Sequence, residues 1–306
     1  MSGLEAVNCN LCGSDDADLL YPSTLPEVTD HAHNLEAFQC TYSGYGVHGP
    51  VVKCRRCGLV YINPRPNAPD VLDDYQGVVD ELYVEEREGR VLTFQRHLRP
   101  LERIAGPPDG KRLLDVGCHI GVFVEVAQQG GWDAQGVEPS RWAAEQAQSQ
   151  GLKVVAGTLA TSGLKDASFD VITLWDVIEH VPDPKGELCE VHRLLKPGGV
   201  VVIHTIDIES PFARLMGRRW PWLMEMHLYY FAPRTLRRML EEVGFEVIHS
   251  SPQGRYLRLG YLISRLQPYS RPVYRLLDAI VTRLNLRGIA VPINLGDLFT
   301  MYASKR

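Results

Sequence analysis

The 306-residue sequence lacks any apolar run long enough to cross a membrane, and its first seven residues contain neither a basic start nor an apolar stretch. It also lacks internal repeats and low-complexity tracts. These absences predict a globular, cytoplasmic protein. The formal net charge of −5 gives no strongly basic character, which argues against a partner held mainly through phosphate contacts.

Cysteine is scarce, and its distribution is uneven. Five of the seven cysteines lie within the first 65 residues, at Cys9, Cys12, Cys40, Cys54 and Cys57. Structural disulfides are rare in a reducing compartment, so grouped cysteines there indicate metal ligands or reactive thiols. Cys40 has no partner in the pattern, and we expect it to be a buried or loop cysteine.

The other four form two Cys-x-x-Cys pairs, Cys9 with Cys12 and Cys54 with Cys57. This spacing lets two thiolates turn toward one ion, and two such pairs complete the tetrahedral coordination that zinc prefers. A closed four-cysteine site has no open position, so it predicts a structural zinc ion rather than a catalytic one. The alternatives are unrelated free thiols or a redox dithiol, but a redox pair normally opens a helix in a βαβ unit, and neither pair does so.

The remainder of the chain alternates apolar strands with helices, after a helical segment at 70–104. This alternation predicts an α/β fold with a doubly wound, mostly parallel sheet of seven strands. We expect strands at 112–116, 134–137, 154–155, 169–175, 200–204, 245–248 and 298–303, and helices at 122–129, 141–149, 185–195 and 234–243. The segment 255–287 is predicted to be an amphipathic helical insertion.

A glycine-containing turn follows the first sheet strand, in the sequence Asp-Val-Gly-Cys-His-Ile-Gly at 115–121. A strand, such a turn and a helix place backbone amides at the crevice where doubly wound folds bind nucleotides. Gly117 and Gly121 allow a ligand to approach the backbone closely. Glu138 ends the second strand, where a carboxylate can accept both hydroxyls of a ribose. Taken alone, the glycine pattern also fits a nicotinamide enzyme.

Three further motifs narrow the choice: Gly-Val-Glu-Pro-Ser at 136–140, Phe-Asp-Val-Ile-Thr-Leu-Trp-Asp-Val-Ile-Glu-His-Val at 169–181, and Leu-Lys-Pro-Gly-Gly at 195–199. As a set with the turn, they disfavour a nicotinamide oxidoreductase. Over residues 111–248 the chain resembles the class I (Rossmann-like) S-adenosylmethionine-dependent methyltransferases. The cysteine pairs and the sequence Glu-Met-His-Leu-Tyr-Tyr-Phe at 225–231 resemble a subgroup with an N-terminal zinc-binding segment, which includes sugar C-methyltransferases of nucleotide-sugar pathways.

The resemblance implies three regions: a zinc-binding module at 1–65, a helical cap or linker at 66–108, and a methyltransferase domain at 109–306. It also implies a cofactor site. The expected cofactor-binding residues are Asp115, Gly117, His119, Gly121, Glu138, Thr158, Leu159, Trp175 and Asp176. Within this set, the 115–121 turn would shape the pocket for the methionine part, Glu138 would hold the ribose, and the 157–159 backbone with Leu159 would contact the adenine. His119 as an ordinary loop histidine and Asp176 as a helix cap remain open alternatives.

Methyl transfer requires the acceptor in line with the sulfonium carbon, exclusion of water and often removal of a proton. The candidate bases are His180, after the fourth strand, and His227, with Glu225 placed to orient or pair with it. Alternatively, residues 225–231 only pack a lid. Tyr75 and Tyr83 lie in the helical segment expected to cover the cofactor.

The predicted function is therefore methyl transfer from S-adenosylmethionine to a small molecule, such as a sugar, a nucleotide-sugar or a lipid-linked glycan precursor. The arginine-rich insertion 255–287 is either a solvated helical cap or a surface that meets an anionic acceptor or an anionic membrane. Two alternatives remain: an RNA methyltransferase whose zinc module binds RNA, and a binding protein that holds the cofactor without turnover. The acidic net charge and the absence of an Asn-Pro-Pro-Tyr sequence after the fourth strand disfavour RNA.

Overall fold

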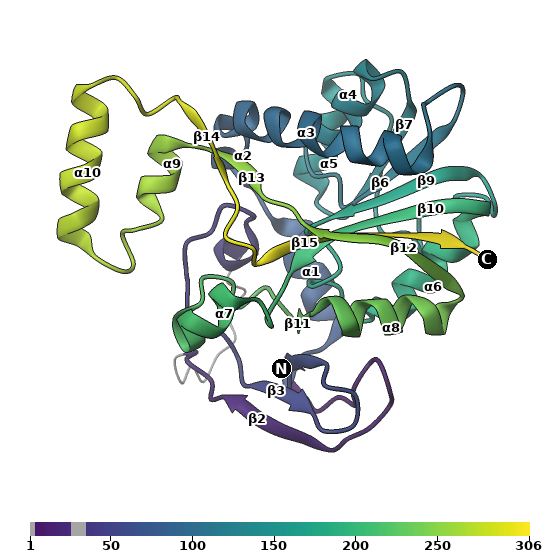
Figure 1. The fold of residues 1–306 in the computed structure, drawn as a ribbon, viewed down its shortest axis with the longest axis horizontal. Coiled ribbons are helices and arrows are strands. Elements are labelled where there is room, and N and C mark those ends of the chain that lie inside the picture. Colours follow the sequence, from purple (N-terminus) through teal and green to yellow (C-terminus); the bar gives the residue numbers. More distant parts are fainter. Residues whose placement is uncertain (1–3, 26–34) are drawn as a thin grey trace.

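The computed structural model describes residues 4–25 and 35–306 (Figure 1). Residues 1–3 and 26–34 belong to the expected zinc-binding region and lie outside the described residues. Within the described part of the chain, no helix is both long enough and apolar enough to cross a membrane.

A seven-stranded sheet forms the centre of the molecule, with the strand order β12-β15-β10-β9-β6-β7-β8. β15 runs antiparallel to both of its neighbours, and the other neighbouring pairs are parallel. The predicted doubly wound, mostly parallel sheet is therefore confirmed. Its strands are β6 (Arg112–Val116), β7 (Asp133–Glu138), β8 (Val154–Ala156), β9 (Phe169–Trp175), β10 (Leu195–Ile206), β12 (Phe245–Pro252) and β15 (Leu298–Lys305).

Helices cover both faces of this sheet (Figure 1). On one face lie α3 (Arg87–Ala105), α4 (Val122–Gln129) and α5 (Arg141–Ser149), and on the other lie α6 (Pro184–Leu194) and α8 (Pro233–Val243). Successive strand residues point to opposite faces, so Leu113 packs with the first set of helices and Leu114 with the second. Burial of both apolar faces is the main driving force for this layered arrangement.

Two of these helices begin at side-chain caps that the sequence supplies. Ser140 Oγ accepts a hydrogen bond from the Ala143 amide at the start of α5. Asp183 accepts one from the Gly186 amide at the start of α6, where Pro184 occupies the first turn. Two further helices, α1 (Ala68–Gly77) and α2 (Glu81–Glu85), precede α3.

The N-terminal region forms a four-stranded antiparallel sheet with the order β11-β4-β3-β2. Its outer strand β11 (Tyr229–Tyr230) comes from the middle of the methyltransferase region, so the N-terminal sheet is completed by a distant segment of the chain. The other elements of this region are β1 (Leu4–Glu5), β2 (Ala17–Tyr21), the 3-10 helix η1 (Leu35–Phe38), β3 (Val51–Cys54), β4 (Val60–Ile62) and β5 (Arg65–Pro66).

The C-terminal insertion projects from the sheet on a two-stranded stalk (Figure 1). β13 (Arg255–Arg258) pairs with β14 (Ala290–Ile293), and the helices α9 (Leu259–Ser264) and α10 (Arg271–Arg283) lie between them. The expectation of a helical segment over 255–287 was wrong at its first four residues. They form a strand because they pair with β14, which lies more than thirty residues further along the chain. Local periodicity does not reveal so distant a partner. Between β10 and β11 lie α7 (Pro211–Met216) and the 3-10 helix η2 (Gly217–Arg219).

Candidate active site and metal centre

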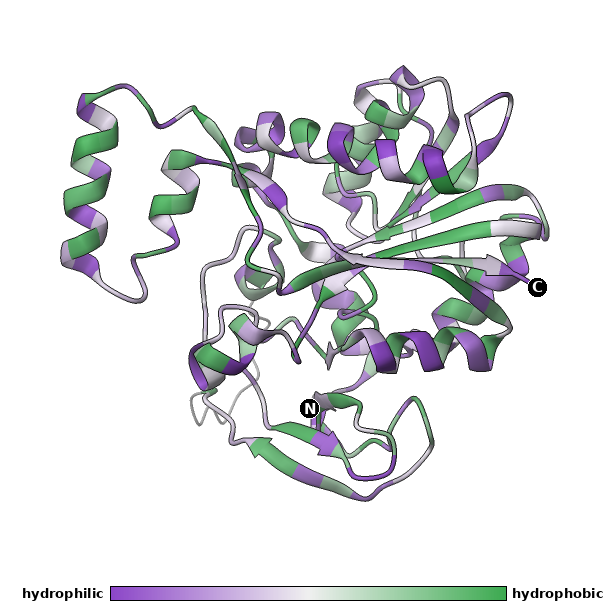
Figure 2. Ribbon diagram, in the orientation of Figure 1, coloured by the Kyte–Doolittle hydropathy of each residue, from purple (hydrophilic) through white to green (hydrophobic). Residues whose placement is uncertain are grey.

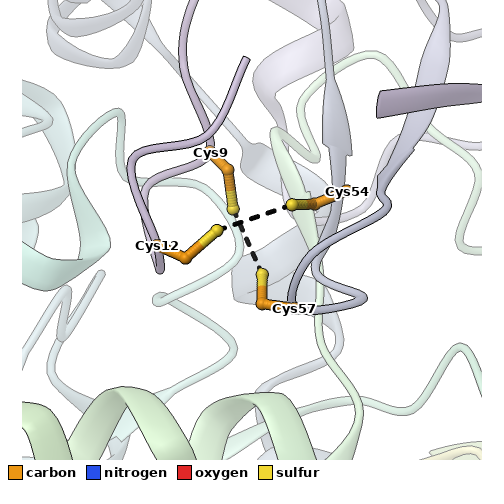
Figure 3. A group of neighbouring side chains, drawn as sticks. All are labelled: Cys9, Cys12, Cys54 and Cys57. Atoms are coloured by element: carbon orange, nitrogen blue, oxygen red, sulfur yellow. Dashed lines mark hydrogen bonds between the residues drawn. The ribbon is translucent and has the colours of Figure 1, made fainter. Parts of the chain in front are cut away.

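The four paired cysteines converge on one point, with their sulfur atoms all within 4.8 Å of one another (Figure 3). Two short contacts join the pairs: Cys9 Sγ lies 3.4 Å from Cys57 Sγ, and Cys12 Sγ lies 3.5 Å from Cys54 Sγ. The cluster of four cysteines predicted from the spacing is therefore present.

The two Cys-x-x-Cys turns have the same backbone geometry. Gly13 donates its amide to the Cys9 carbonyl at 2.8 Å, and Gly58 donates its amide to the Cys54 carbonyl at 2.9 Å. Both glycines have positive φ values, 72° and 78°, which a residue without Cβ adopts readily. Burial raises the pKa of the Cys9 thiol to about 11, whereas at Cys54 burial is outweighed by hydrogen bonds from Cys57 and Cys12, and its pKa falls to about 7. A cation shared by the four sulfur atoms would compensate the charge of their thiolates. Four thiolates of this arrangement match the donor set of a tetrahedral zinc ion.

A cavity of about 960 Å³ lies beside the carboxyl ends of β6, β7, β9 and β10. Its lining also comes from α1, α3, the N-terminal region and the C-terminal insertion. This position is where open α/β sheets bind ligands, and the volume suits a cofactor together with a small acceptor.

The 117–121 turn forms one wall of the cavity, through Gly117 and His119. Gly117 has φ 65°, and a Cβ there would lie 2.7 Å from a methyl group of Val177. Gly121 has φ 78°, and a Cβ there would lie 2.5 Å from Leu152. His119 is buried, and neither of its ring nitrogens has a hydrogen-bond partner among the described residues. The turn therefore requires glycine at both positions and directs an unsatisfied imidazole into the cavity.

Glu138 ties the turn to the end of β7. Its two carboxylate oxygens accept backbone amides, from His119 at 2.7 Å and from Ser140 at 2.8 Å. Burial raises the pKa of Glu138 to about 7, although these two hydrogen bonds oppose the rise. Each oxygen keeps a further lone pair, so the carboxylate can also accept hydroxyl groups from a ligand in the cavity.

The other expected cofactor residues divide into two groups. The residues that line the cavity are Thr158, Leu159, Trp175 and Asp176. Asp115 and Gly121 lie behind the lining, and Asp115 accepts a hydrogen bond from Thr173 Oγ1 at 2.7 Å. Burial raises the pKa of Asp115 to about 8. This hydrogen bond joins β6 to β9 within the sheet, just before the turn.

His180 and His227 lie together at another part of the cavity, with ring centroids 4.7 Å apart. His180 Nδ1 lies 3.1 Å from the Met226 carbonyl, and His227 Nδ1 lies 2.7 Å from the Trp222 carbonyl. A carbonyl oxygen only accepts, so each Nδ1 carries the proton and each neutral ring keeps Nε2 as an acceptor. Burial lowers the pKa of His180 to about 4 and that of His227 to about 3.

Glu225 does not line the cavity, and the Trp222 carbonyl, not the Glu225 carboxylate, contacts His227 Nδ1. Glu179 lies closer, and it accepts a hydrogen bond from Thr205 Oγ1 at 2.8 Å. Ligand atoms of Glu179, His180 and His227 all lie within 4.8 Å of one another, a spacing that could hold a cation. Burial, with the charge of Asp176 adding to it, raises the pKa of Glu179 to about 8.

Sequence reasoning missed several polar residues of the cavity. His97 on α3 and His204 on β10 have ring centroids 5.3 Å apart, and Asp176 Oδ1 lies 3.9 Å from His204 Nδ1. Arg90 on α3 is a cation in the cavity wall. His204 was detectable, because it lies near the carboxyl end of a predicted parallel strand. His97 and Arg90 were not, because a helical period alone does not show which face meets the cavity.

The family profile described as "Methyltransferase domain" matches residues 83–250, more than half of the chain. The chain belongs to the S-adenosylmethionine-dependent methyltransferases. The matched residues contain the 117–121 turn, Glu138, Asp176 and both histidines of the His180–His227 pair.

Similar proteins agree with this assignment. The ubiquinone biosynthesis O-methyltransferase of Methylococcus capsulatus is 35% identical over 105 residues, which are 32% of this chain and 44% of that protein. The enzyme of the same name from Aeromonas salmonicida is 29% identical over 184 residues, 52% of this chain and 77% of that one. This chain thus covers less than half of the first relative. A methyltransferase structure from Bacillus halodurans covers 68% of this chain with 17% identity and a TM-score of 0.50, a likeness in fold; the match covers 98% of that chain.

Proposed function

We propose that this protein transfers the methyl group of S-adenosylmethionine to a small-molecule acceptor bound in the cavity. The observation that carries the proposal is that one cavity joins the 117–121 turn and Glu138 to the neutral imidazoles of His180 and His227. The residues proposed to bind the cofactor and the histidines proposed to accept a proton therefore line the same cavity.

The residues fit the cofactor. The glycine turn leaves room for close approach to its backbone, Glu138 retains acceptor capacity for ribose hydroxyls, and His119 offers two unsatisfied ring nitrogens. When bound, S-adenosylmethionine supplies an activated methyl group. The polypeptide then has to bind, orient and desolvate the acceptor.

His227 is the proposed general base, with His180 as its neighbour. The Trp222 carbonyl fixes the tautomer of His227, so Nε2 can accept a proton from an acceptor hydroxyl or carbon acid. Tyr75 packs edge-on against His180, with ring centroids 6.0 Å apart, so α1 covers this part of the cavity and helps to exclude water.

The proposed acceptor is a sugar, a nucleotide-sugar or a lipid-linked glycan precursor. Support comes from the resemblance of the cysteine pairs and of residues 225–231 to sugar C-methyltransferases, and from the many polar groups in the cavity wall. The two relatives described above are O-methyltransferases named for ubiquinone biosynthesis, so a hydroxyl acceptor is a second candidate chemistry.

The cysteine cluster is proposed to hold a structural zinc ion. The thiols offer four donors and no open position for a substrate, so the ion would stabilise the N-terminal sheet without taking part in the reaction.

The helix α10 is proposed to contact an anionic membrane surface, which suits a lipid-linked acceptor. Figure 2 shows apolar residues along this projecting helix. Leu276 is 62% exposed and Ile280 44% exposed. The exposed apolar residues recur at helical spacing and form one stripe, composed of Val273, Leu276, Ile280 and Leu284. Arg271, Arg275 and Arg283 lie on the same helix, and a basic amphipathic helix is attracted to anionic lipid.

Calorimetry with S-adenosylhomocysteine tests the proposed function. Wild-type protein should bind this demethylated product, and Glu138→Gln should weaken binding about tenfold or more, because a neutral amide cannot accept both backbone amides and the ribose. Glu145→Gln on the exposed side of α5 is the matched control and should bind normally. Absence of binding by folded wild-type protein would reject the proposal, and unchanged affinity of Glu138→Gln would reject the assigned contact.

A further inference from the structure

Three arginine side chains from distant parts of the chain meet in the cavity wall. Arg90 comes from α3, Arg255 from β13, and Arg265 from the residue that follows α9. Tyr261 on α9 lies among them, and the charges of all three guanidinium groups act on its phenol. One end of the cavity is therefore rich in positive charge.

Only part of this charge is balanced by the described residues. Arg255 lies 3.1 Å from Asp176 Oδ1. The described residues provide no carboxylate within 4.0 Å of Arg90 or Arg265. The buried Asp80 carboxylate acts on Arg90 only from beyond that distance, and the Glu86 carboxylate lies 3.8 Å from Arg258. In addition, the Nε atoms of Arg90, Arg255 and Arg265 are buried without a hydrogen-bond partner among these residues. Buried cations without partners are costly, so this end of the cavity is complementary to an anion.

Arg90 and Arg265, the two arginines without a nearby carboxylate, both contact aromatic rings. The guanidinium carbon of Arg90 lies 3.4 Å from the ring centroid of Tyr83, and that of Arg265 lies 3.9 Å from the ring centroid of Tyr261. Arg265 also donates a hydrogen bond to the Tyr42 carbonyl at 3.1 Å. A guanidinium over a ring face still has N–H groups in its own plane that can bind a ligand, and this planar fork suits phosphate or carboxylate oxygens.

The stack also relates Arg90 to the cofactor turn. Tyr83 lies against the His119 ring with centroids 3.7 Å apart, so Arg90, Tyr83 and His119 are consecutive neighbours. Arg265 instead contacts Tyr42, Tyr45 and Tyr261, and none of these residues belongs to the turn. An anion shared by Arg90 and Arg265 would therefore lie between the cofactor turn and the C-terminal insertion, on the acceptor side of the cavity.

We propose that Arg90 and Arg265 bind a phosphate or carboxylate group of the methyl acceptor, so that the natural acceptor is an anionic small molecule. This inference rests on the proposed function and names its substrate class. Arg255 is neutralised by Asp176 and contributes to the positive field without being the principal ligand. The C-terminal insertion thus supplies part of the acceptor site.

The test uses inorganic pyrophosphate as the phosphate probe and malonate as the carboxylate probe, each titrated into wild-type protein saturated with S-adenosylhomocysteine. At least one probe should bind with a stoichiometry of one. Arg90→Met and Arg265→Met should each weaken that binding roughly 10- to 100-fold. Arg90→Lys and Arg265→Lys should restore part of it, because they keep the charge but lose the fork. Arg96→Met on the same helix as Arg90 is the matched control, since Arg96 does not line the cavity.

Each outcome is decisive once thermal unfolding shows that the variants fold. The proposal would be overturned if wild-type protein bound neither probe. It would also be overturned if both methionine variants bound the probe as tightly as wild-type protein does. A loss of affinity for S-adenosylhomocysteine in Arg90→Met that equals its loss for the probe would likewise overturn it, because Arg90 would then hold the cofactor's own carboxylate. Failure of the proposed function is separate, because it appears as absence of S-adenosylhomocysteine binding in wild-type protein before any probe is added.

Discussion

The two terminal parts of the chain both reach the cavity, but they are attached to the rest of the molecule in different ways. The N-terminal sheet incorporates β11, and its core includes the fully buried rings of Tyr61, Tyr229 and Tyr230. The C-terminal insertion projects on a two-stranded stalk and exposes an apolar stripe on α10. The comparison indicates that the proposed base lies on the tightly packed wall, whereas part of the proposed acceptor site lies on the projecting one.

Arg65 shows how firmly the N-terminal wall is joined to the residues around His227. Its guanidinium donates to the Tyr229 hydroxyl at 2.8 Å and to the Pro182 carbonyl at 2.9 Å. These bonds connect β5, which follows the N-terminal sheet strand β4, to β11 and to the loop after His180. A change in the cysteine cluster should therefore alter the positions of His180 and His227.

The largest expected effect follows loss of a cysteine ligand. Cys57→Ser should remove most of the bound zinc and lower the free energy of unfolding by roughly 3 kcal/mol or more, because ion binding and folding of this region are coupled. Metal analysis under reducing conditions and urea denaturation measure both quantities. Cys189→Ser, at an exposed cysteine on α6, is the control and should keep zinc and stability. Zinc-free wild-type protein, or an unchanged stability of Cys57→Ser, would contradict the prediction.

The next effect concerns the proposed base on the packed wall. His227→Gln should reduce kcat by about 10²- to 10⁴-fold, because general-base catalysis typically contributes that much. Its affinity for S-adenosylhomocysteine should stay within about twofold of wild type, since the residue lies away from the cofactor turn. The assay uses the first nucleotide-sugar or other anionic acceptor that wild-type protein methylates. His249→Gln, at an exposed position on β12, should leave kcat unchanged. Full activity of His227→Gln would remove it as the base.

A third prediction concerns the protonation of the same histidine. Burial lowers the pKa of His227 to about 3, and the charges of His180 and Arg255 add to the lowering, while Asp176 and the bond to Trp222 oppose it. Because the folded-state pKa lies below the ordinary value of about 6.5, the ring stays neutral through the physiological range and gains a proton only in strong acid. Glu179 lies beside His227, and its own raised pKa means that its carboxyl group carries little negative charge at neutral pH.

NMR titration of protein with 13C-labelled histidine measures this directly. The His227 signal, assigned by its absence in His227→Gln, should not shift between pH 5.5 and 8. A His227 midpoint between pH 6 and 7 would show that the packed wall is open to solvent.

The sequence was sufficient for the central sheet and the cysteine cluster. Residues 112–116 and 169–175 are short, mostly apolar segments bounded by turns and alternating with helical segments, so they predict buried parallel strands. The cysteine spacing predicts convergence because the two-residue separation is itself the geometric requirement of a metal site.

The N-terminal sheet and the arginine cluster could not be predicted in the same way. β11 has two residues and pairs with β4 about 170 positions earlier, so no local pattern predicts this strand. Arg90 and Arg265 line the same cavity only because α3 and the end of α9 both pack around it. In the sequence, each resembles an ordinary surface arginine of a helical segment. Long-range packing, not local propensity, creates these features.

The smallest expected effect on stability comes from the projecting wall, where it separates membrane contact from folding. Leu276→Glu combined with Ile280→Glu should change the free energy of unfolding by less than about 0.5 kcal/mol, because both side chains are already in solvent. The same variant should lose cosedimentation with phosphatidylglycerol vesicles, whereas wild-type protein should sediment with them and remain in the supernatant with phosphatidylcholine. Ile248→Glu, at an exposed apolar position on β12, is the control and should behave as wild type. If wild-type protein stays in the supernatant with phosphatidylglycerol vesicles, the proposed membrane contact is rejected. A large loss of stability in the double variant would show that α10 packs against the body of the molecule.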